Sequence, residues 1–298
     1  MMAIPTCSWD RLAQHPVICL APGLFGSAAA AKSCQGIPWR VECTYQGRTE
    51  QWIFEGPTPL SFLDYRVFMA LTAAIHWSRD QRLRLGVQPN SEVGRTLRRG
   101  LALQGIDGMV YAVRTAISEL TREAGYTESR HLTTVVRASL ERLHATRVTR
   151  RVRDDACQQS RLIHYVVTGP YRRPVLVAMN PWVSALQDRR AGGGNRPRLR
   201  YAQGSLAQMR ILVRVSEVAV RIYWRLCGWV DPGGSAKKVA LKTLMEYGWG
   251  PATHGVSDRV RRYRRARTQE AVQALTTIGW QVAGPIGDRQ IYTVAREI

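Results

Sequence analysis

The sequence predicts an α+β fold in which one order of elements occurs twice along the chain. In each occurrence a helix, a short helix and a longer helix are followed by short strands that are rich in β-branched residues. A helix-turn-helix followed by a β-hairpin is the element order of a winged-helix domain. We therefore expect two tandem winged-helix domains behind a short N-terminal extension, with the boundaries 1–56, 57–190 and 191–298.

The N-terminal extension is rich in proline and otherwise irregular. Two short alternating runs, Trp39 to Tyr45 and Glu50 to Phe54, lie on either side of Gly47. Alternation of apolar and polar residues around a glycine is typical of a β-hairpin. We expect one small hairpin in this extension.

The first domain is predicted to begin with a helix, because apolar residues recur at helical spacing from Leu60 to Ala74. Ser61 and Asp64 have the spacing of a capping box at the start of this helix. Residues 77–108 contain scattered glycine, arginine and proline and are predicted to form an irregular connection.

The rest of the first domain is predicted to form the helix-turn-helix and its wing. A short helix over 115–124 ends at Gly125, and a longer helix runs from Thr127 or Ser129 to about His144. Strands are expected at 110–113, 146–152, 162–167 and 175–179, with a polar turn between the second and the third.

The second domain begins after the glycine run 191–195, which is the clearest linker signal in the chain. A long helix capped by Ser257 or Asp258 is predicted to run to Ile278 and to end at Gly279. The other expected elements are a strand at 199–201, helices at 217–227 and 239–247, and a hairpin of 280–282 with 290–294.

The composition indicates a polyanionic partner. Lysine and arginine number 43 against 22 acidic residues, which gives a net charge of +21, and only four of the 43 are lysines. The guanidinium group binds phosphates and guanine edges through two parallel hydrogen bonds. A chain this basic is expected to bind nucleic acid.

Two arginine clusters lie at equivalent places in the two domains. The long helix of the second domain is cationic in its first turns and apolar in its last, which is typical of a recognition helix whose N-terminal half enters the major groove. Arginines that do not reach base edges would contact phosphates. The alternative is that these runs are solvated helix faces or contacts to RNA. The predicted DNA-binding residues are Arg130, Thr134, Arg137, Arg150 and Arg151 in the first domain and Arg259, Arg261, Arg262, Arg264, Arg265 and Arg267 in the second.

Patterns typical of catalysis or metal binding are missing from the sequence. The six cysteines contain no C-x-x-C pair, the histidines contain no H-x-H pair, and residues 233–238 lack the spacing of a phosphate-binding loop. We therefore expect no enzyme activity, no cofactor and no metal site. No run approaches the roughly 20 apolar residues that span a bilayer. We expect a cytoplasmic protein without a membrane partner.

Several motifs are shared with a known family. They are residues 19–25 (Cys-Leu-Ala-Pro-Gly-Leu-Phe), Met179-Asn180-Pro181 and residues 225–233 (Arg-Leu-Cys-Gly-Trp-Val-Asp-Pro-Gly), with further similarity in 57–74 and over the arginine-rich helix that ends in Ile278-Gly279-Trp280. On these residues the chain resembles plasmid replication initiators, most closely the RepC initiators of IncQ-type broad-host-range plasmids. Residues 77–110 and 154–161 match the family pattern poorly.

The resemblance implies an initiator that binds double-stranded DNA at direct repeats, called iterons, in a plasmid origin. Such a protein promotes opening of an A+T-rich segment and recruits a plasmid-encoded helicase, which works with a primase. By resemblance, the long helix of the second domain is the main major-groove reader. The active form is a monomer or a homodimer. The alternative is a winged-helix transcriptional repressor without a role in replication, which the composition does not distinguish from an initiator.

Overall fold

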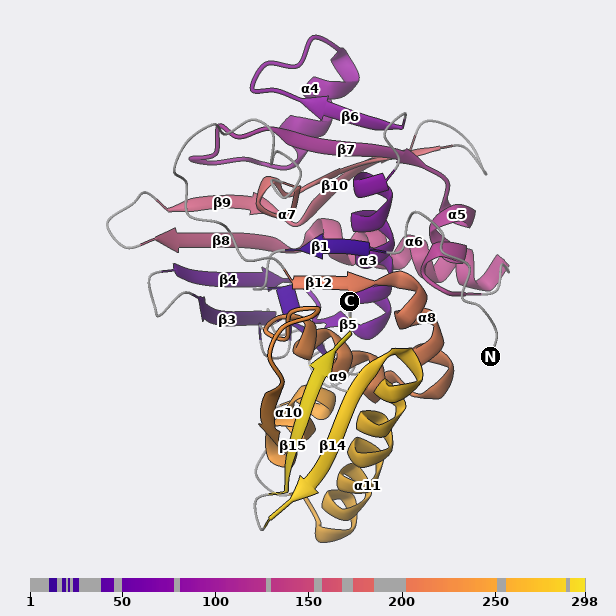
Figure 1. Ribbon diagram of the computed structural model, residues 1–298. Helices are drawn as coiled ribbons and strands as arrows, with labels where there is room; N and C mark the ends of the chain where they lie inside the picture. The colour runs from indigo at the N-terminus through magenta and orange to yellow at the C-terminus, as the bar shows by residue number, and fades with distance from the viewer. Residues whose placement is uncertain are drawn as a thin grey trace.

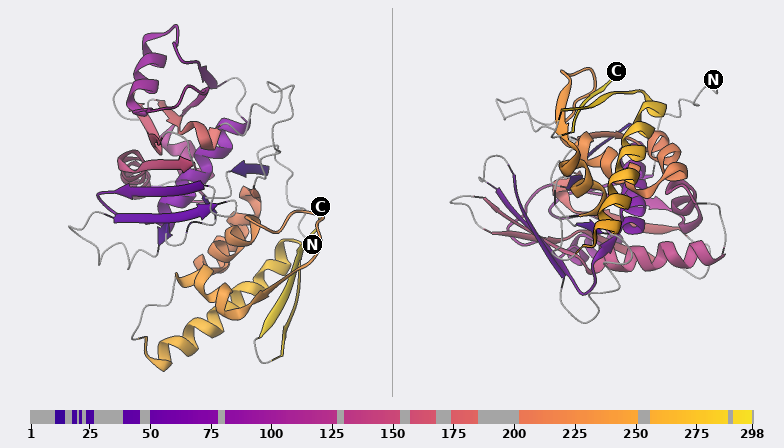
Figure 2. Two further views of the ribbon diagram at one scale, coloured as in Figure 1. Left: turned by 90° about the vertical axis from the view of Figure 1, so that its left-hand side faces the viewer. Right: turned by 90° about the horizontal axis from the view of Figure 1, so that it is seen from below.

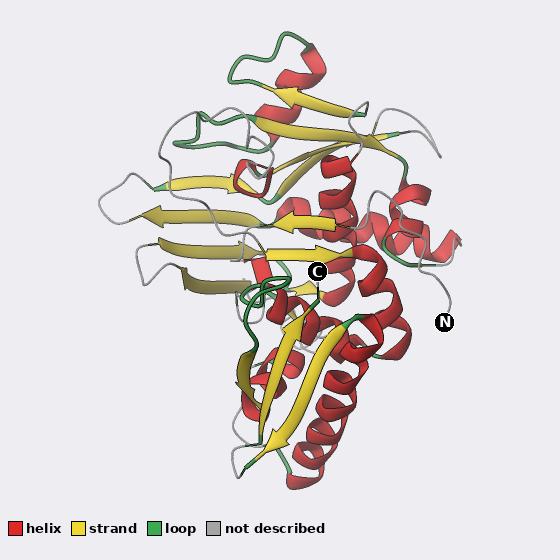
Figure 3. Cartoon of the chain, in the orientation of Figure 1, coloured by secondary structure: helices red, strands yellow, loops and turns green. Residues whose placement is uncertain are grey.

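The computed structural model of the protein is a mixed α/β fold with several separate sheets (Figure 1, Figure 3). It describes residues 11–14, 18–19, 21, 24–26, 39–45, 50–77, 81–126, 130–152, 157–167, 174–184, 202–250, 256–287 and 290–297. We call residues up to 184 the first unit and residues from 202 the second unit. Figure 2 shows that the second unit extends away from one side of the first.

A four-stranded antiparallel sheet in the order β10-β11-β7-β6 forms the centre of the first unit. Helix α3 (Phe62–Trp77) covers one face, and α4 (Glu92–Gly100) covers the other. Alternate residues of one strand therefore join different cores: Tyr111 lies in the large core on the α3 side, and Val110 lies in a small core under α4. The strands are β6 (Arg82–Leu85), β7 (Val110–Thr115), β10 (Ile163–Val167) and β11 (Val175–Met179).

The second sheet of the first unit confirms the predicted N-terminal hairpin and corrects the predicted wing. Its order is β3-β4-β8-β9, so the hairpin pairs with the strand that follows the long helix. The polar turn expected before residue 162 contains strand β9, which pairs with β8, whereas β10 joins the central sheet. An edge strand is half solvated and needs no apolar alternation, so its polar residues resemble a turn. The strands are β3 (Trp39–Tyr45), β4 (Glu50–Gly56), β8 (Arg147–Val152) and β9 (Gln158–Arg161).

Helices of the first unit agree with the prediction in one segment and differ in another. Helices α5 (Ile117–Glu123) and α6 (Arg130–Ala145) occupy the predicted positions. Gly125 adopts φ +78°, which lets the chain turn between them. Residues 77–108, which were predicted to be irregular, contain β6 and α4. The prediction was wrong because α4 is short, contains three arginines and a glycine on either side of them, and buries Leu97 as its single large apolar side chain. A short helix, α7 (Pro181–Ser184), follows β11.

The second unit confirms three predicted elements: the helix over 217–227, the long helix and the C-terminal hairpin. Helix α8 was not predicted. The helix predicted over 239–247 begins two residues later, at Leu241, because residues 237–240 form a strand that pairs with β15. The resulting three-stranded sheet has the order β13-β15-β14. The elements are β12 (Ala202–Ser205), α8 (Leu206–Val215), α9 (Glu217–Cys227), β13 (Lys237–Ala240), α10 (Leu241–Trp249), α11 (Asp258–Ala274), the 3-10 helix η2 (Leu275–Ile278), β14 (Trp280–Ile286) and β15 (Ile291–Arg296).

Backbone pairing and a continuous core join the two units. Strand β1 (Arg11–Gln14) of the first unit pairs antiparallel with β12 of the second. Within the first unit, β2 (Phe25–Gly26) pairs parallel with β5 (Leu60–Ser61) at the start of α3. The largest hydrophobic cluster contains buried residues of both units, from Ile18 to Val294. The glycine run 191–195 and the strand predicted at 199–201 lie outside the described residues. The domain boundaries stay a prediction.

Side chains of α3 and α5 hold the second unit in place. The rings of Tyr65 and Trp224 meet edge to face with centroids 5.6 Å apart. Arg210 of α8 forms an ion pair with Glu123 at the end of α5 and donates to its backbone oxygen at 3.1 Å. These contacts come from helices on either side of the unit boundary, so they fix the orientation of the two units.

Candidate nucleic-acid interface

Helix α11 is the strongest candidate for contact with nucleic acid. The Ser257 hydroxyl caps it by accepting a hydrogen bond from the Val260 amide at 3.4 Å. Its buried residues, Thr268, Ala271 and Val272, all lie in its C-terminal half. The N-terminal half therefore projects beyond the core. In Figure 1 this end of α11 lies at the bottom of the molecule, the same end as the tip of the β14–β15 hairpin.

The six arginines of α11 fall into two groups according to their contacts. In the described part of the chain, Arg259, Arg262 and Arg265 are exposed and have no hydrogen-bond or ion-pair partner. The others are held by neighbours: Arg261 lies 3.3 Å from Asp258, Arg267 lies 2.6 Å from Glu270, and Arg264 lies over the Trp249 ring. Exposed ion pairs contribute only about 0–1 kcal/mol. A polyanion can therefore displace Asp258 and Glu270 at little cost.

Helix α10 fixes the direction in which α11 projects. Trp249, the last residue of α10, donates from Nε1 to the Thr268 hydroxyl at 3.1 Å. That hydroxyl in turn donates to the Arg264 backbone oxygen at 2.7 Å. The Trp249 ring also meets the Tyr263 ring edge to face at 6.0 Å. One tryptophan thus supports two turns of α11 at the junction of its cationic and buried halves.

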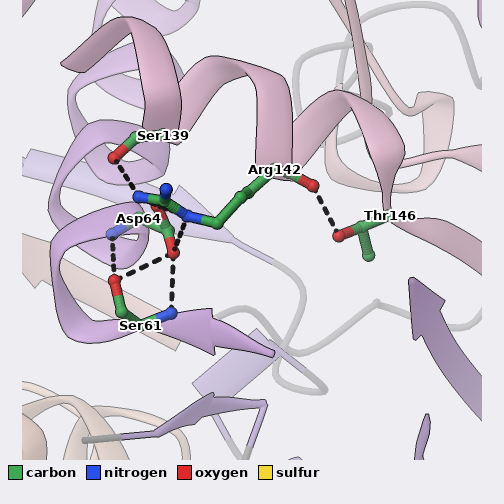
Figure 4. Close-up of polar contacts among 5 residues, drawn as sticks. All are labelled: Ser61, Asp64, Ser139, Arg142 and Thr146. Carbon is green, nitrogen blue, oxygen red and sulfur yellow. Dashed lines mark hydrogen bonds and ion pairs between the residues drawn. The ribbon is translucent and has the colours of Figure 1, made fainter. Parts of the chain in front are cut away.

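In the first unit, the candidate residues of α6 lie on a helix that an ion pair between Arg142 and Asp64 holds against α3 (Figure 4). Asp64 is fully buried and accepts hydrogen bonds from Arg142 Nη2 at 2.8 Å and from the Ser61 amide at 2.7 Å. The Ser61 hydroxyl lies 3.4 Å from the Asp64 amide, so the predicted capping box is confirmed. Thr134 and Arg137 are exposed on this helix, and Arg130 is its first residue.

The two candidate arginines of β8 have different surroundings. Arg150 forms an ion pair with Glu50 at 2.6 Å, and its guanidinium lies 5.6 Å from the centre of the Trp52 ring. Arg151 points to the opposite face of the strand, because side chains alternate, and is exposed. Arg147 is exposed on the same face as Arg151. Arg150 therefore supports the β4–β8 pairing, whereas Arg147 and Arg151 are exposed to solvent.

A comparison with protein families identifies the group to which the chain belongs. The family described as replication protein C (RepC) matches residues 8–296. The chain belongs to the RepC family of replication proteins. No curated protein matches this RepC-family chain.

Two solved structures share its fold. A crystal structure of domains 2 and 3 of RctB has a TM-score of 0.54 and 10% sequence identity, covering 94% of this chain and 97% of that one. A second structure of RctB domains 2-3 has a TM-score of 0.52 and 10% identity, covering 95% and 97%. The similarity extends over both units of the RepC-family protein.

The sequence motifs that resemble other initiators have structural roles in this RepC-family protein. Arg225, at the start of one motif, is half-buried and donates from Nη2 to the backbone oxygen of Ala21, in another motif, at 2.7 Å. Burial lowers the pKa of this guanidinium. Asn180 accepts a hydrogen bond from the Trp182 amide at 2.9 Å and so caps α7. These two motif residues therefore support the fold.

Two histidines meet where α6 ends against β10. The rings of His144 and His164 lie 5.0 Å apart, and Arg161 donates to the His144 backbone oxygen at 3.2 Å. Burial, reinforced by His144 and Arg161, lowers the pKa of His164 to about 4. Burial lowers the pKa of His144 as well. Both rings are therefore neutral at neutral pH and serve to pack α6 on the sheet.

The described residues offer few groups suited to other chemistry. Burial raises the pKa of Cys43 to about 12 and that of Cys227 to about 11, so both thiols stay protonated. No group of three His, Cys, Asp or Glu side chains with metal-binding placement occurs among the described residues. In the same part of the chain, no helix combines the length and apolar character that crossing a membrane requires.

Proposed function

We propose that this RepC-family protein initiates plasmid replication by binding double-stranded iteron repeats at the origin, as the IncQ-type initiators that it resembles do. It then promotes opening of the duplex and recruits the plasmid-encoded helicase and primase. It acts without catalysis. The observation that carries the proposal is helix α11, which is anchored by its C-terminal half and presents unpartnered arginines on its projecting half.

Under this proposal the second unit works as a winged helix. Helices α10 and α11 are the helix-turn-helix, and the β14–β15 hairpin is the wing beside it. The N-terminal half of α11 enters the major groove, where Arg259, Arg262 and Arg265 reach bases or phosphates. Arg261, Arg264 and Arg267 add positive charge around them.

The first unit contacts DNA next to the segment that α11 reads. Helix α6 would present Arg130, Thr134 and Arg137, and strand β8 would present Arg151. Arg150 belongs to the same set, although its pairing with Glu50 leaves it less free. The contacts between Arg210 and Glu123 hold the two units at a fixed separation, so adjacent DNA segments would be read at a fixed spacing.

The test is fluorescence anisotropy of the full chain with a duplex that contains direct repeats from the plasmid encoding it. A scrambled duplex of equal length is the competitor at about 150 mM salt, because affinity for DNA depends on salt. We expect binding to the repeats to be at least about 10³-fold tighter than binding to the scrambled duplex. Equal affinity for both duplexes would overturn sequence-specific binding.

A transcriptional repressor with the same interface would pass that test, so a second measurement separates the two functions. Permanganate footprinting of a supercoiled origin detects unpaired thymines. An initiator makes thymines in the A+T-rich segment reactive when it binds. If the protein binds the repeats and the thymines of the A+T-rich segment stay unreactive, the result would favour the repressor function. Sedimentation of the complex then shows whether a monomer or a homodimer binds each repeat.

A further inference from the structure

An apolar groove of about 490 Å³ lies between helices α10 and α11. Its floor contains Leu241, Met245 and Trp249 from α10. Its rim is cationic, with Arg261 and Arg265 among the lining residues from α11. The groove thus combines an apolar floor with a dense positive charge at its edge.

DNA binding by the winged helix does not account for the apolar floor of this groove. Phosphates and base edges are polar, and a duplex held by the rim arginines would leave the floor without an apolar partner. Apolar side chains spaced by three or four residues on a helix fill such a groove between two helices. Methionine has a flexible side chain that adapts to different apolar partners. The floor therefore fits apolar anchors of a peptide segment.

The positively charged rim favours a negatively charged segment. Arg261, Arg262, Arg264 and Arg265 line the groove together with Lys242, and Glu246 is the acidic residue that opposes them. Carboxylates form paired hydrogen bonds with guanidinium groups and would compensate this charge. A basic or neutral segment would leave the arginines unpaired or repelled.

We propose that this groove binds an acidic amphipathic helix of a protein partner, with apolar anchors on Leu241, Met245 and Trp249 and carboxylates on the arginine rim. Arg262 and Arg265 belong both to the rim and to the predicted DNA contacts. The bound helix and duplex DNA therefore exclude one another, and this exclusion rests on the proposed function of α11. A partner of this kind would release the protein from its origin.

The probe is a fluorescein-labelled 16-residue helical peptide with leucine at positions 4, 8 and 11 and mainly glutamate elsewhere. One control peptide has lysine in place of glutamate, and another has serine in place of leucine. We expect the full chain to bind the probe at about 150 mM salt, and both controls at least tenfold more weakly. Failure to bind the probe, or equal binding of the three peptides, would overturn the proposal.

Variants of the groove test whether the peptide probe binds there. Met245→Glu places a carboxylate in the floor, and Lys242→Glu reverses a charge at the rim without touching the core. We expect each to weaken probe binding at least tenfold. Val215→Glu, at the exposed end of α8, makes the same charge change as Met245→Glu and should leave binding unchanged. Circular dichroism verifies folding, and Lys242→Glu remains informative if Met245→Glu is unstable. Unchanged binding by Lys242→Glu would exclude the groove.

Competition separates this inference from the proposed function. The unlabelled repeat duplex should displace the probe from the parent protein. If the protein binds the probe and does not bind the repeats, the proposed function fails while the groove assignment stands. If probe and duplex bind together in one complex, the exclusion is wrong.

Discussion

At the residue scale, the arginines of α11 differ in whether another side chain of the protein contacts them. Arg262 and Arg265 have no partner among the described residues, whereas Arg267 is paired with Glu270 and Arg264 lies on Trp249. An unpartnered guanidinium loses no internal contact when it binds DNA. If α11 binds DNA as proposed, we therefore expect the unpartnered arginines to contribute most to the affinity.

Replacing Arg262 or Arg265 by alanine should weaken binding to the repeat duplex by about 1–3 kcal/mol if the side chain contacts a base edge. Anisotropy at fixed salt measures the loss. Arg214→Ala, an exposed arginine of α8 outside the predicted set, is the control. If both α11 variants bind the repeats as the parent does, α11 is not the reading helix.

Asp64 of α3 holds α6 through its buried ion pair with Arg142. Asp64→Ala should lower the free energy of unfolding by roughly 3 kcal/mol, because breaking a buried ion pair leaves Arg142 uncompensated. Urea denaturation followed by circular dichroism measures this change. Ser139→Ala removes only a 3.3 Å hydrogen bond to the same guanidinium and should cost about 1 kcal/mol or less. Equal losses in the two variants would contradict the role of Asp64.

At the element scale, the predictions succeeded where the signal is local. The Ser257 cap and Gly279 in the left-handed conformation bound the long helical segment of α11 and η2, and both were identified from neighbouring residues. Strand β9 and helix α4 were missed because one lies at a sheet edge and the other buries few apolar side chains. Their positions depend on partners far along the chain, which periodicity does not include.

The junction of α6 with β10 should make stability depend on pH. The folded state binds a proton at His164 more weakly than the unfolded state, because the pKa falls from its ordinary 6.5 to about 4. The contribution of the neutral His164 ring to the free energy of unfolding is fully present above pH 6.5. It is lost as the pH falls from 6.5 toward 4.

We therefore expect the urea midpoint to fall between pH 7.5 and pH 5, and His164→Gln to reduce that fall. The readout is the difference in slope between variant and parent, since carboxylates also respond to acid. His131→Gln, an exposed histidine on α6, is the control and should keep the slope of the parent. An unchanged slope in His164→Gln would contradict this origin of the pH dependence.

At the scale of the whole molecule, charge and shape act together. The chain has a net charge of +21, and a single core extends through both units. The arginine cluster of α11 and the arginines of α6 and β8 are therefore connected through one continuous core. Binding should release many counterions, because both clusters would meet phosphates of one duplex.

The logarithm of the affinity for duplex DNA should fall steeply and linearly with the logarithm of the salt concentration. Arg151→Ala should reduce that slope by about one if the side chain contacts a phosphate, with little change in sequence preference. Titrations between about 50 and 200 mM salt measure both effects. An affinity independent of salt would exclude a polyanion as the main partner.

The sequence alone determined the basic charge, the α11 helix with its caps, the two hairpins and the RepC-type motifs. The charge is a sum over the whole chain, and the caps, hairpins and motifs depend on residues that lie within a few positions of one another. The tertiary structure decided which arginines are free. Arg150 is held by Glu50, which lies 100 residues away, and Arg264 rests on a tryptophan of the preceding helix. It also decided that the N-terminal hairpin joins β8 and that the two units share one core. Such contacts arise from packing between distant segments, and no local pattern of residues specifies them.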